Sequence, residues 1–154
     1  MKVADWAVEQ GAALIVTYGL GSCVACVIHD PVAGAGGLAH VLLPSPTLAR
    51  DRSNPAKFPE TAVPLLVDEL VRLGAARERL RARLVGGASM FARGGAPGIA
   101  MGDRNVAALR EALQAARIPL IGEDTGLDYG RSVTLHLPEG RLEVRSVQHG
   151  TREL

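Results

Sequence analysis

Residues 11–28 read GAALIVTYGLGSCVACVI, and none of them is charged. The stretch holds two apolar runs of strand length, residues 12–18 and 23–29, on either side of the turn-forming sequence Gly19-Leu20-Gly21-Ser22. Its length reaches the lower limit for a membrane-spanning helix, but the glycines, hydroxyls and thiols within it favour a pair of strands around a glycine turn. We therefore expect these two strands near the centre of the fold.

The first third of the chain is predicted to form the interior. From residue 12 to residue 49 the only formal charge is that of Asp30, whereas the rest of the chain is densely charged. A third apolar run follows at residues 38–43. Near-continuous apolar runs are typical of strands that are covered on both faces, so we expect layers on both sides of these strands.

Two helices are predicted beyond this region. We expect Pro64 in the first turn of the first helix, where its missing N–H has no intrahelical partner, and Gly74 as the terminator. The second helix is predicted over residues 104–117, with Asp103 as its N-cap and Pro119 beyond its end. The inward-facing residues of the first helix share helical spacing and are Val63, Leu66, Leu70 and Leu73.

Further strands are predicted before and after the second helix. Residues 79–84 alternate between arginine and apolar side chains, which indicates a strand with one solvated face that carries Arg79, Arg81 and Arg83. Strands are also expected over residues 119–122, 131–137 and 141–147, with a hairpin turn at 138–140. Strands grouped at both ends with two helices between them favour the α+β class, with mixed β-sheet layers packed on two main helices in one domain over residues 1–154.

The composition excludes several function classes. The 154 residues include 17 Lys and Arg and 16 Asp and Glu, and the net charge of +1 gives no general attraction to nucleic acid or anionic lipid. Two cysteines are too few for a disulfide-dense secreted scaffold. Acidic Asp5 and Glu9 lie where a signal peptide needs basic residues. We expect a cytoplasmic protein with neither nucleic-acid binding nor direct membrane insertion.

Cys23 is the candidate nucleophile, because it follows the glycine turn where the chain enters a buried strand. A thiol attacks carbonyl carbon as the thiolate, so it needs a nearby imidazole or oriented N–H donors. His40 is the distinctive histidine, since it lies inside an apolar strand where a polar ring needs a partner. If the two strands are neighbours, the side chains meet at one end of a sheet. The alternative is that both are ordinary core residues.

Cys26 invites two other interpretations of the cysteine pair. In a redox protein, Cys26 would resolve an adduct on Cys23, but strand positions three apart face opposite sides of a sheet, so we expect Cys26 in the core. A metal site would need a second Cys-x-x-Cys or a paired histidine motif, and the sequence has neither. No phosphate-binding Gly-x-x-x-x-Gly-Lys is present. We therefore predict no metal and no cofactor.

Several motifs in a fixed order resemble the chemoreceptor glutamine deamidases, the CheD family of bacterial chemotaxis proteins. The resemblance covers nearly the whole chain. The matching segments are TYGLGSCV (17–24), GGLAHVLLP (36–44), FPETAVPLL (58–66), GGASMF (86–91), GDRNV (102–106) and GEDTG (122–126) followed by YGR (129–131).

This resemblance implies hydrolysis of selected glutamine side chains to glutamate on methyl-accepting chemoreceptors, with release of ammonia. It implies that Cys23 is the nucleophile, that His40 is the base, and that Thr17 orients His40. The chemistry would proceed through a thioester, with the oxyanion met by the N–H groups of Cys23 and of the preceding turn. Gly21 and Ser22 are expected to line the substrate site.

Phe91 is also expected on the substrate side, where an apolar side chain beside a flexible turn can receive a receptor helix or a regulatory partner. The alternative is that Phe91 packs in the core. The resemblance further implies the cytoplasmic helices of chemoreceptors as substrate and, in many members, a complex with a CheC-type phosphatase. Three alternatives stay open: a receptor methylesterase, a non-enzymatic chemotaxis adaptor, and a thiol–disulfide protein that depends on Cys26.

Overall fold

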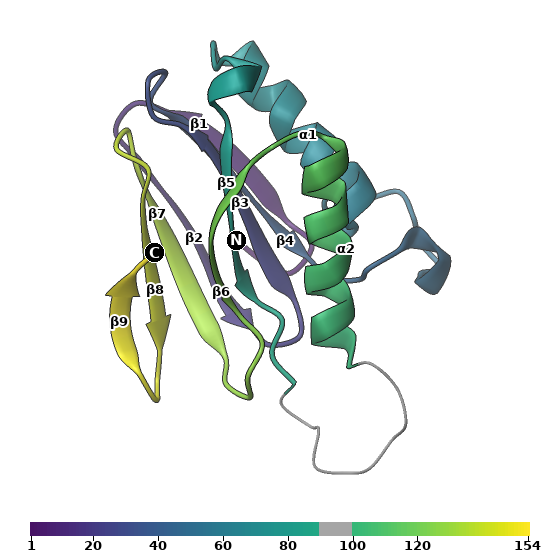
Figure 1. Cartoon of the computed structure of the whole chain (residues 1–154). Helices are drawn as coiled ribbons and strands as arrows, with labels where there is room; N and C mark the ends of the chain where they lie inside the picture. The colour runs from purple at the N-terminus through teal and green to yellow at the C-terminus, as the bar shows by residue number, and fades with distance from the viewer. Residues whose placement is uncertain (90–99) are drawn as a thin grey trace.

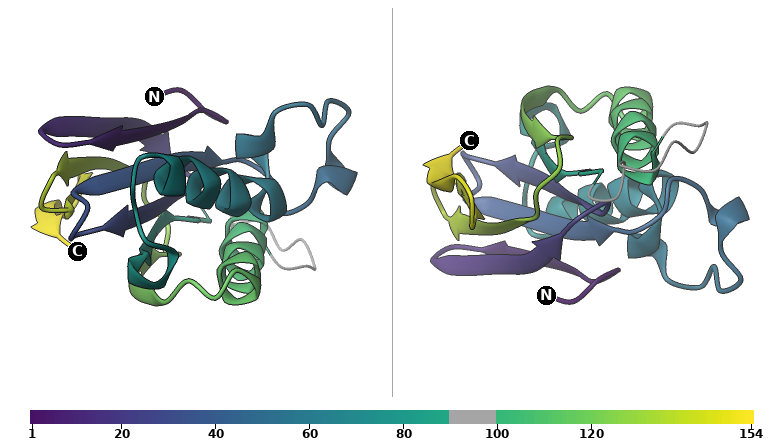
Figure 2. Two further views of the ribbon diagram at one scale, coloured as in Figure 1. Left: turned by 90° about the horizontal axis from the view of Figure 1, so that it is seen from above. Right: turned by 90° about the horizontal axis from the view of Figure 1, so that it is seen from below.

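The computed structural model describes residues 1–89 and 100–154, and these residues form three layers. Two helices cover one face of a five-stranded sheet, and a four-stranded sheet covers the other face (Figure 1). Figure 2 shows the same arrangement from above and from below. The predicted α+β class with a mixed sheet is confirmed.

The central sheet has the strand order β1-β4-β3-β5-β6. β5 and β6 run parallel, and the other neighbours in this sheet are antiparallel. Every residue of β3 and β4 is buried, as their near-continuous apolar sequences predicted. The bounds are β1 Trp6–Gln10, β3 Val24–Asp30, β4 Ala35–Val41, β5 Arg81–Gly86 and β6 Leu120–Thr125.

The outer sheet is antiparallel, with the order β2-β7-β8-β9. The predicted hairpin turn joins β7 to β8, where the N–H of Gly140 donates to the carbonyl of His136 at 2.9 Å. β1 and β9 were not predicted: β1 has no fully buried residue and β9 is exposed throughout. The bounds are β2 Ala13–Leu20, β7 Arg131–Leu137, β8 Arg141–Ser146 and β9 Gly150–Glu153.

The helices are α1, Pro59–Arg72, and α2, Met101–Ala115, and each differs from its prediction at one position. Pro64 lies beyond the first turn of α1, so the expected first-turn placement was wrong, and the helix tolerates one missing hydrogen bond. α2 begins three residues earlier than predicted, so Asp103 lies in its first turn and does not cap it. Gly74 follows α1 with a φ of 96°, as its terminator role requires.

One face predicted to be solvated is covered. Arg83 is 5% exposed, and its guanidinium donates to the carbonyls of Gly140 at 2.6 Å and Leu154 at 2.8 Å. The alternation along β5 was interpreted correctly as a strand, but the outer sheet lies over the arginine face and supplies the carbonyls that Arg83 needs. A single strand does not reveal which layer will cover it.

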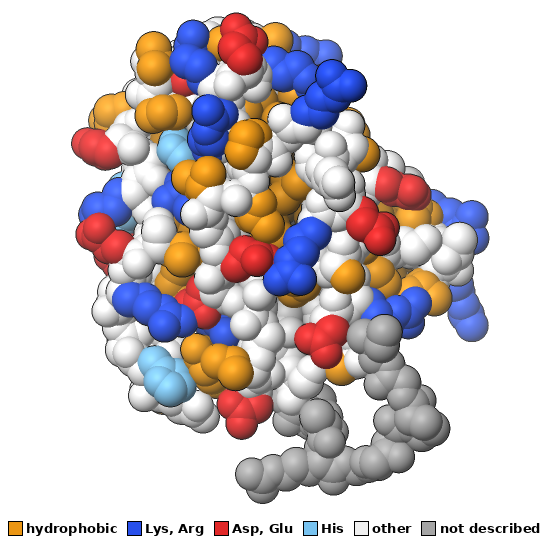
Figure 3. Space-filling model, in the orientation of Figure 1, with side chains coloured by type: hydrophobic (Ala, Val, Ile, Leu, Met, Phe, Trp, Pro, Cys, Tyr) orange, Lys and Arg blue, Asp and Glu red, His pale blue; other side chains and the backbone are white. Residues whose placement is uncertain are grey.

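Two apolar clusters lie on opposite sides of the central sheet. The alternation of side chains along β3 sends Val24, Cys26 and Ile28 toward the helices and Ala25 and Val27 toward the outer sheet. On the face of the molecule that Figure 3 shows, basic and acidic side chains are interspersed. Among the described residues, no helix has the length and apolar character to cross a membrane.

Candidate active site

Cys23 lies directly before β3, in the short connection that carries the chain from the outer sheet to the central sheet. It is 8% exposed and packs in the cluster between the two sheets, on the same side as Ala25. A bulge separates Thr17 from Leu20 in the pairing of β2 with β7, and Gly19 within it has a φ of 69°. The bulge bends the end of β2 so that the chain can cross between the sheets.

His40 lies on β4 directly opposite Ala25 of β3. The condition stated for a meeting of the two side chains, that their strands are neighbours, is therefore met. Because Cys23 precedes Ala25 by two residues, its side chain and that of His40 are diagonal neighbours on one face of the sheet. His40 is fully buried, and its backbone N–H donates to the carbonyl of Asp5 at 2.9 Å. The histidine is thus held in place by the segment directly before β1 as well as by β3.

Thr17 reaches His40 from the opposite sheet. Its Oγ1 lies 2.9 Å from Nδ1 of His40 and also donates to the carbonyl of Met1 at 3.3 Å. A hydroxyl has one proton, so a hydroxyl that donates to Met1 accepts its second hydrogen bond from Nδ1–H of His40. In that tautomer Nε2 carries a lone pair. Among the described residues, buried Nε2 has no hydrogen-bond partner, so it is free to take a proton.

The environment favours uncharged forms of both reactive groups. Burial, aided by the positive charge of the N-terminal ammonium, lowers the pKa of His40 below its ordinary value. Burial raises the pKa of the Cys23 thiol, although its own backbone N–H opposes the shift. At neutral pH these shifts favour a neutral thiol and a neutral imidazole, so we expect proton transfer between them to accompany the attack on a substrate.

Backbone hydrogen bonds fix the turn that precedes the thiol. The carbonyl of Gly21 accepts from the N–H of Ala88 at 2.8 Å, and the carbonyl of Cys23 accepts from the N–H of Gly87 at 2.9 Å. Gly21 and Ser22, the two expected lining residues in this turn, are half-buried directly before Cys23. Phe91, the third expected lining residue, lies outside the described residues.

Asn105 of α2 is the residue that the sequence interpretation missed. It is fully buried, and its side-chain Nδ2 donates to the carbonyls of Ser22 and Leu42. The signal was present, because Asn105 lies four positions before Leu109 and therefore occupies the apolar stripe of the helix. An amide in such a stripe needs polar partners.

Cys26 belongs to the helix-side core, as predicted from its spacing. It is fully buried, packs in the cluster beneath α1 and α2, and has a pKa raised by burial to about 12. Cys23 lies in the other cluster, on the opposite face of the sheet. In residues 1–89 and 100–154, no group of three or more His, Cys, Asp or Glu side chains is placed to hold a metal ion.

Comparison with known proteins identifies the family of this chain. The sequence model of a family described as CheD chemotactic sensory transduction matches residues 42–146. The chain is 45% identical to the "Probable chemoreceptor glutamine deamidase CheD 2" of Geobacter metallireducens, over 99% of this chain and 95% of the relative. The chain belongs to the CheD family. The resemblance inferred from the sequence motifs is confirmed.

Other CheD relatives come from distant organisms. The chain is 39% identical to the "Probable chemoreceptor glutamine deamidase CheD" of Caldanaerobacter subterraneus, over 97% of this chain and 93% of the relative. It is 41% identical to the protein of the same name from Pyrococcus horikoshii, over 96% and 91%. Thr17, Cys23 and His40 precede the range that the CheD family model matches, and the near-complete coverage by these relatives extends the similarity to that part of the chain.

Two of the CheD motifs contain Asp124 and Arg131. The structure gives these two residues a role in folding. Their side chains form a buried ion pair at 3.0 Å, and Arg131 also donates to the carbonyl of Gly126 at 2.9 Å. The N–H of Gly126 in turn donates to the carbonyl of Gly86, beside the turn that holds Cys23. This arrangement gives the two residues a structural role, as a buried ion pair.

Proposed function

We propose that this CheD-family chain is a cysteine amidohydrolase that converts glutamine side chains of chemoreceptors to glutamate. The names of its relatives give the substrate class. The observation that supports the mechanism most strongly is the 2.9 Å contact between Thr17 and His40, on the face of the sheet that carries Cys23. The far nitrogen of the ring has no hydrogen-bond partner among the residues that the structure describes. Nucleophile, base and orienting group are the parts that such a reaction needs.

In the first half of the reaction, the sulfur of Cys23 attacks the carboxamide carbon while the thiol proton passes to Nε2 of His40. The carbonyl π electrons move to oxygen, and the backbone N–H of Cys23 donates to the resulting oxyanion. When the carbonyl re-forms, the carbon–nitrogen bond breaks and His40 returns the proton to the leaving nitrogen. Ammonia departs, and the glutamyl group remains on Cys23 as a thioester.

In the second half of the reaction, water is the nucleophile that attacks the thioester. His40 takes a proton from the water, whose oxygen attacks the thioester carbon, and the carbon–sulfur bond then breaks. The proton on His40 returns to the sulfur, so the free enzyme is restored and the product is a glutamate side chain. Thr17 keeps the ring of His40 in the same orientation during both halves.

The substrate in this proposal is a cytoplasmic receptor helix that presents a glutamine to the turn at Gly21 and Ser22, with Phe91 contributing apolar contact. The protein would then work in the cytoplasm. We also infer, from the family resemblance alone, that a CheC-type phosphatase is a candidate regulatory partner. A purified phosphatase of that class that fails to bind the chain would remove this part of the proposal.

Product analysis tests the proposed function. Incubation with a receptor cytoplasmic fragment should raise the mass of a target glutamine peptide by about one unit and release ammonia, as amide hydrolysis requires. Cys23→Ala should abolish both signals. Cys26→Ala is the matched control, because it removes the other thiol from the opposite face of the same sheet and should stay active.

The remaining outcomes separate the alternative functions. Release of methanol from a methylated receptor without deamidation would favour a methylesterase. Deamidation at the wild-type rate by Cys23→Ala would exclude the assigned nucleophile. Receptor binding by both proteins with no product from either would favour an adaptor, and a loss of activity in Cys26→Ala alone would favour a thiol–disulfide protein.

A further inference from the structure

Asn105 connects the two segments that carry the reactive side chains. From α2 its Nδ2 donates to the carbonyl of Ser22 at 2.9 Å and to the carbonyl of Leu42 at 3.1 Å. Ser22 immediately precedes Cys23, and Leu42 follows His40 by two residues. A single buried amide thus ties the turn before the thiol to the end of the strand that holds the imidazole.

The orientation of this amide is determined by its partners. Two carbonyl oxygens can be met only by the NH₂ group, because the amide oxygen of Asn105 accepts and cannot donate. That oxygen, Oδ1, is buried without a hydrogen-bond partner in the described part of the chain. An unpaired buried acceptor lowers stability, so an apolar side chain would serve packing alone better than asparagine does.

The bond to Ser22 also sets the direction of the next N–H. In a trans peptide the C=O and the following N–H point in opposite directions, so holding the Ser22 carbonyl toward α2 turns the Cys23 N–H away from the helix. That N–H donates to no backbone carbonyl among residues 1–89 and 100–154. It is therefore available to an oxyanion formed on the thiol side.

α2 can deliver Asn105 to this position because two glycines allow backbone contact. A Cβ on Gly102 would overlap the carbonyl of Gly87, and a Cβ on Gly87 would overlap the side chain of Val106. The N–H of Gly87 in turn donates to the carbonyl of Cys23. The start of the helix is thus seated directly on the segment that supports the thiol.

We propose that Asn105 is a positioning residue of this site, which holds the Ser22–Cys23 peptide against the end of β4 so that the Cys23 N–H faces the reacting carbonyl. The inference rests on the proposed function. Because small displacements of a reacting group cost as much as about 10²-fold in rate, the loss of this bridge should act on kcat more than on KM.

The decisive variant is Asn105→Asp, which keeps the shape but places an oxygen without a proton against two carbonyls. It should lower kcat by about 10²-fold and change KM by less than about threefold, and Asn105→Ala should behave similarly. Leu113→Ala is the control for stability, since it removes a buried side chain farther along the same helix. At a comparable loss of thermal stability, Leu113→Ala should keep kcat within about threefold.

Three results would overturn the inference. The first is an Asn105→Asp protein that keeps its kcat while Cys23→Ala is inactive, and the second is a Leu113→Ala protein that loses as much kcat as the Asn105 variants. The third result needs no variant. In the wild-type protein, the side-chain amide protons of Asn105 should exchange slowly with solvent. Rapid exchange of both protons would contradict the hydrogen bonds to Ser22 and Leu42. Deamidation by Cys23→Ala would instead overturn the proposed function, whatever Asn105 does.

Discussion

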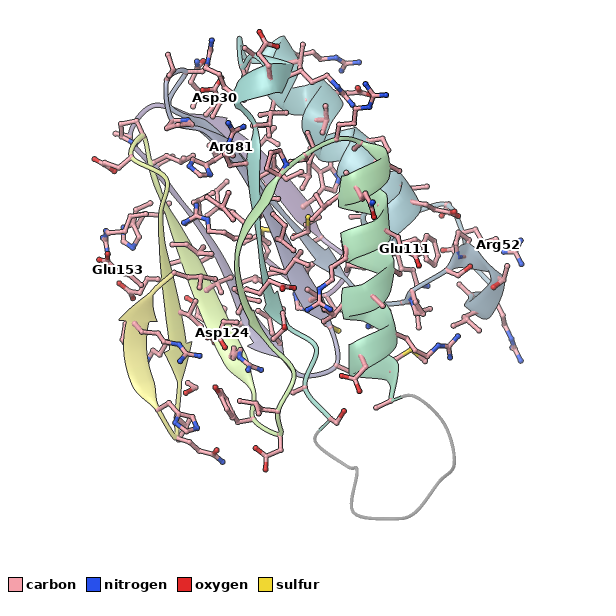
Figure 4. All side chains as sticks on the ribbon, in the orientation of Figure 1. Asp30, Arg52, Arg81, Glu111, Asp124 and Glu153 are labelled. Atoms are coloured by element: carbon pink, nitrogen blue, oxygen red, sulfur yellow. The ribbon has the colours of Figure 1, made fainter. Side chains whose placement is uncertain are left out.

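Buried polar groups near the two ends of β3 differ in their hydrogen bonding. At one end Asp30 is fully buried, and every hydrogen bond to its carboxylate comes from a defined partner: the N–H groups of Val32, Ala33 and Ala76 and the guanidinium of Arg79, at 2.9–3.1 Å. At the other end, Nε2 of His40 and Oδ1 of Asn105 are buried without partners in the described residues. In Figure 4 the labelled Asp30 lies at the far end of the sheet from the turn before β3.

This difference indicates that one end of the seven-residue strand β3 contributes to the stability of the fold and the other end to the chemistry of the site. A satisfied carboxylate joins segments 46 and 49 positions apart in sequence, so it stabilises the fold. Nε2 of His40 and Oδ1 of Asn105 have no hydrogen-bond partner in residues 1–89 and 100–154, so neither atom adds a hydrogen bond to the folded state there, and each can serve an arriving substrate or proton. Substitutions at the Cys23 end should therefore change rates, and substitutions at the Asp30 end should change the free energy of unfolding.

His40→Gln should have the largest effect on the reaction. Glutamine keeps much of the volume but cannot take a proton, so kcat should fall by roughly 10²- to 10⁴-fold. The free energy of unfolding should change by less than about 1 kcal/mol, because Nε2 has no hydrogen-bond partner to lose among the described residues and the glutamine NH₂ can donate to Thr17 in place of Nδ1–H. Deamidation kinetics and urea unfolding measure the two quantities. A variant that loses stability in proportion to activity would remove the distinction between the two ends.

Asp30→Ala should have the largest effect on stability. It leaves Arg79 and three backbone N–H groups without their partner, which should lower the free energy of unfolding by about 2–4 kcal/mol. Activity should be near that of the wild type at temperatures where the variant is folded. Asp51→Ala is the matched control, because Asp51 is an exposed carboxylate that also accepts from a backbone N–H. If both variants unfold alike, the Asp30 cluster is not the stabilising feature inferred here.

Thr17→Val should have an intermediate effect, since it removes the hydroxyl and keeps the branched shape. Without its partner, His40 can adopt the wrong tautomer, and we expect kcat to fall by about 10- to 100-fold. Thr17→Ser restores the hydroxyl and should recover activity to within about threefold of the wild type. Equal activity in the valine and serine variants would show that the hydrogen bond at 2.9 Å does not orient the base.

The smallest effect concerns the pH dependence of stability. Burial alone would raise the pKa of Asp30, but hydrogen bonds from Arg79 and the backbone outweigh it and hold the pKa well below the ordinary value. A lowered folded-state pKa gives stability that is present above the ordinary carboxyl pKa and is lost as the pH falls below about 4. Urea unfolding from pH 6 to pH 3 should therefore show a steeper loss for the wild type than for Asp30→Asn. Parallel curves would contradict the assigned pKa direction.

Local patterns in the sequence predicted most of the fold. The uncharged runs predicted β2, β3 and β4, the helical spacing predicted α1 and α2, and the turn at 138–140 predicted the β7–β8 hairpin. Patterns did not reveal β1 and β9, because strands that bury little have no strong alternation. The burial of Arg83 was also missed, since it depends on a sheet formed by residues far away in sequence.

The candidate site was predicted in part. The glycine turn, the thiol and the histidine within an apolar strand identified the segments that the structure brings together, and strand pairing supplied the juxtaposition. Thr17 came from the family resemblance alone, because a threonine in a strand has no local signal for a partner in another sheet. Asn105 had a local signal, its place in the apolar stripe of α2, but its partners depend on the packing of the helix on Gly87, which no local pattern contains.

The most direct test asks whether the receptor becomes covalently attached to Cys23. A reaction of the wild-type protein with a receptor fragment, stopped with acid, should contain a species with the summed mass of both chains less one ammonia, and peptide mapping should place the bond at Cys23. The species should be absent from Cys23→Ala and should disappear as glutamate forms. Formation of glutamate with no such species, or with the bond at another residue, would contradict thioester catalysis by Cys23.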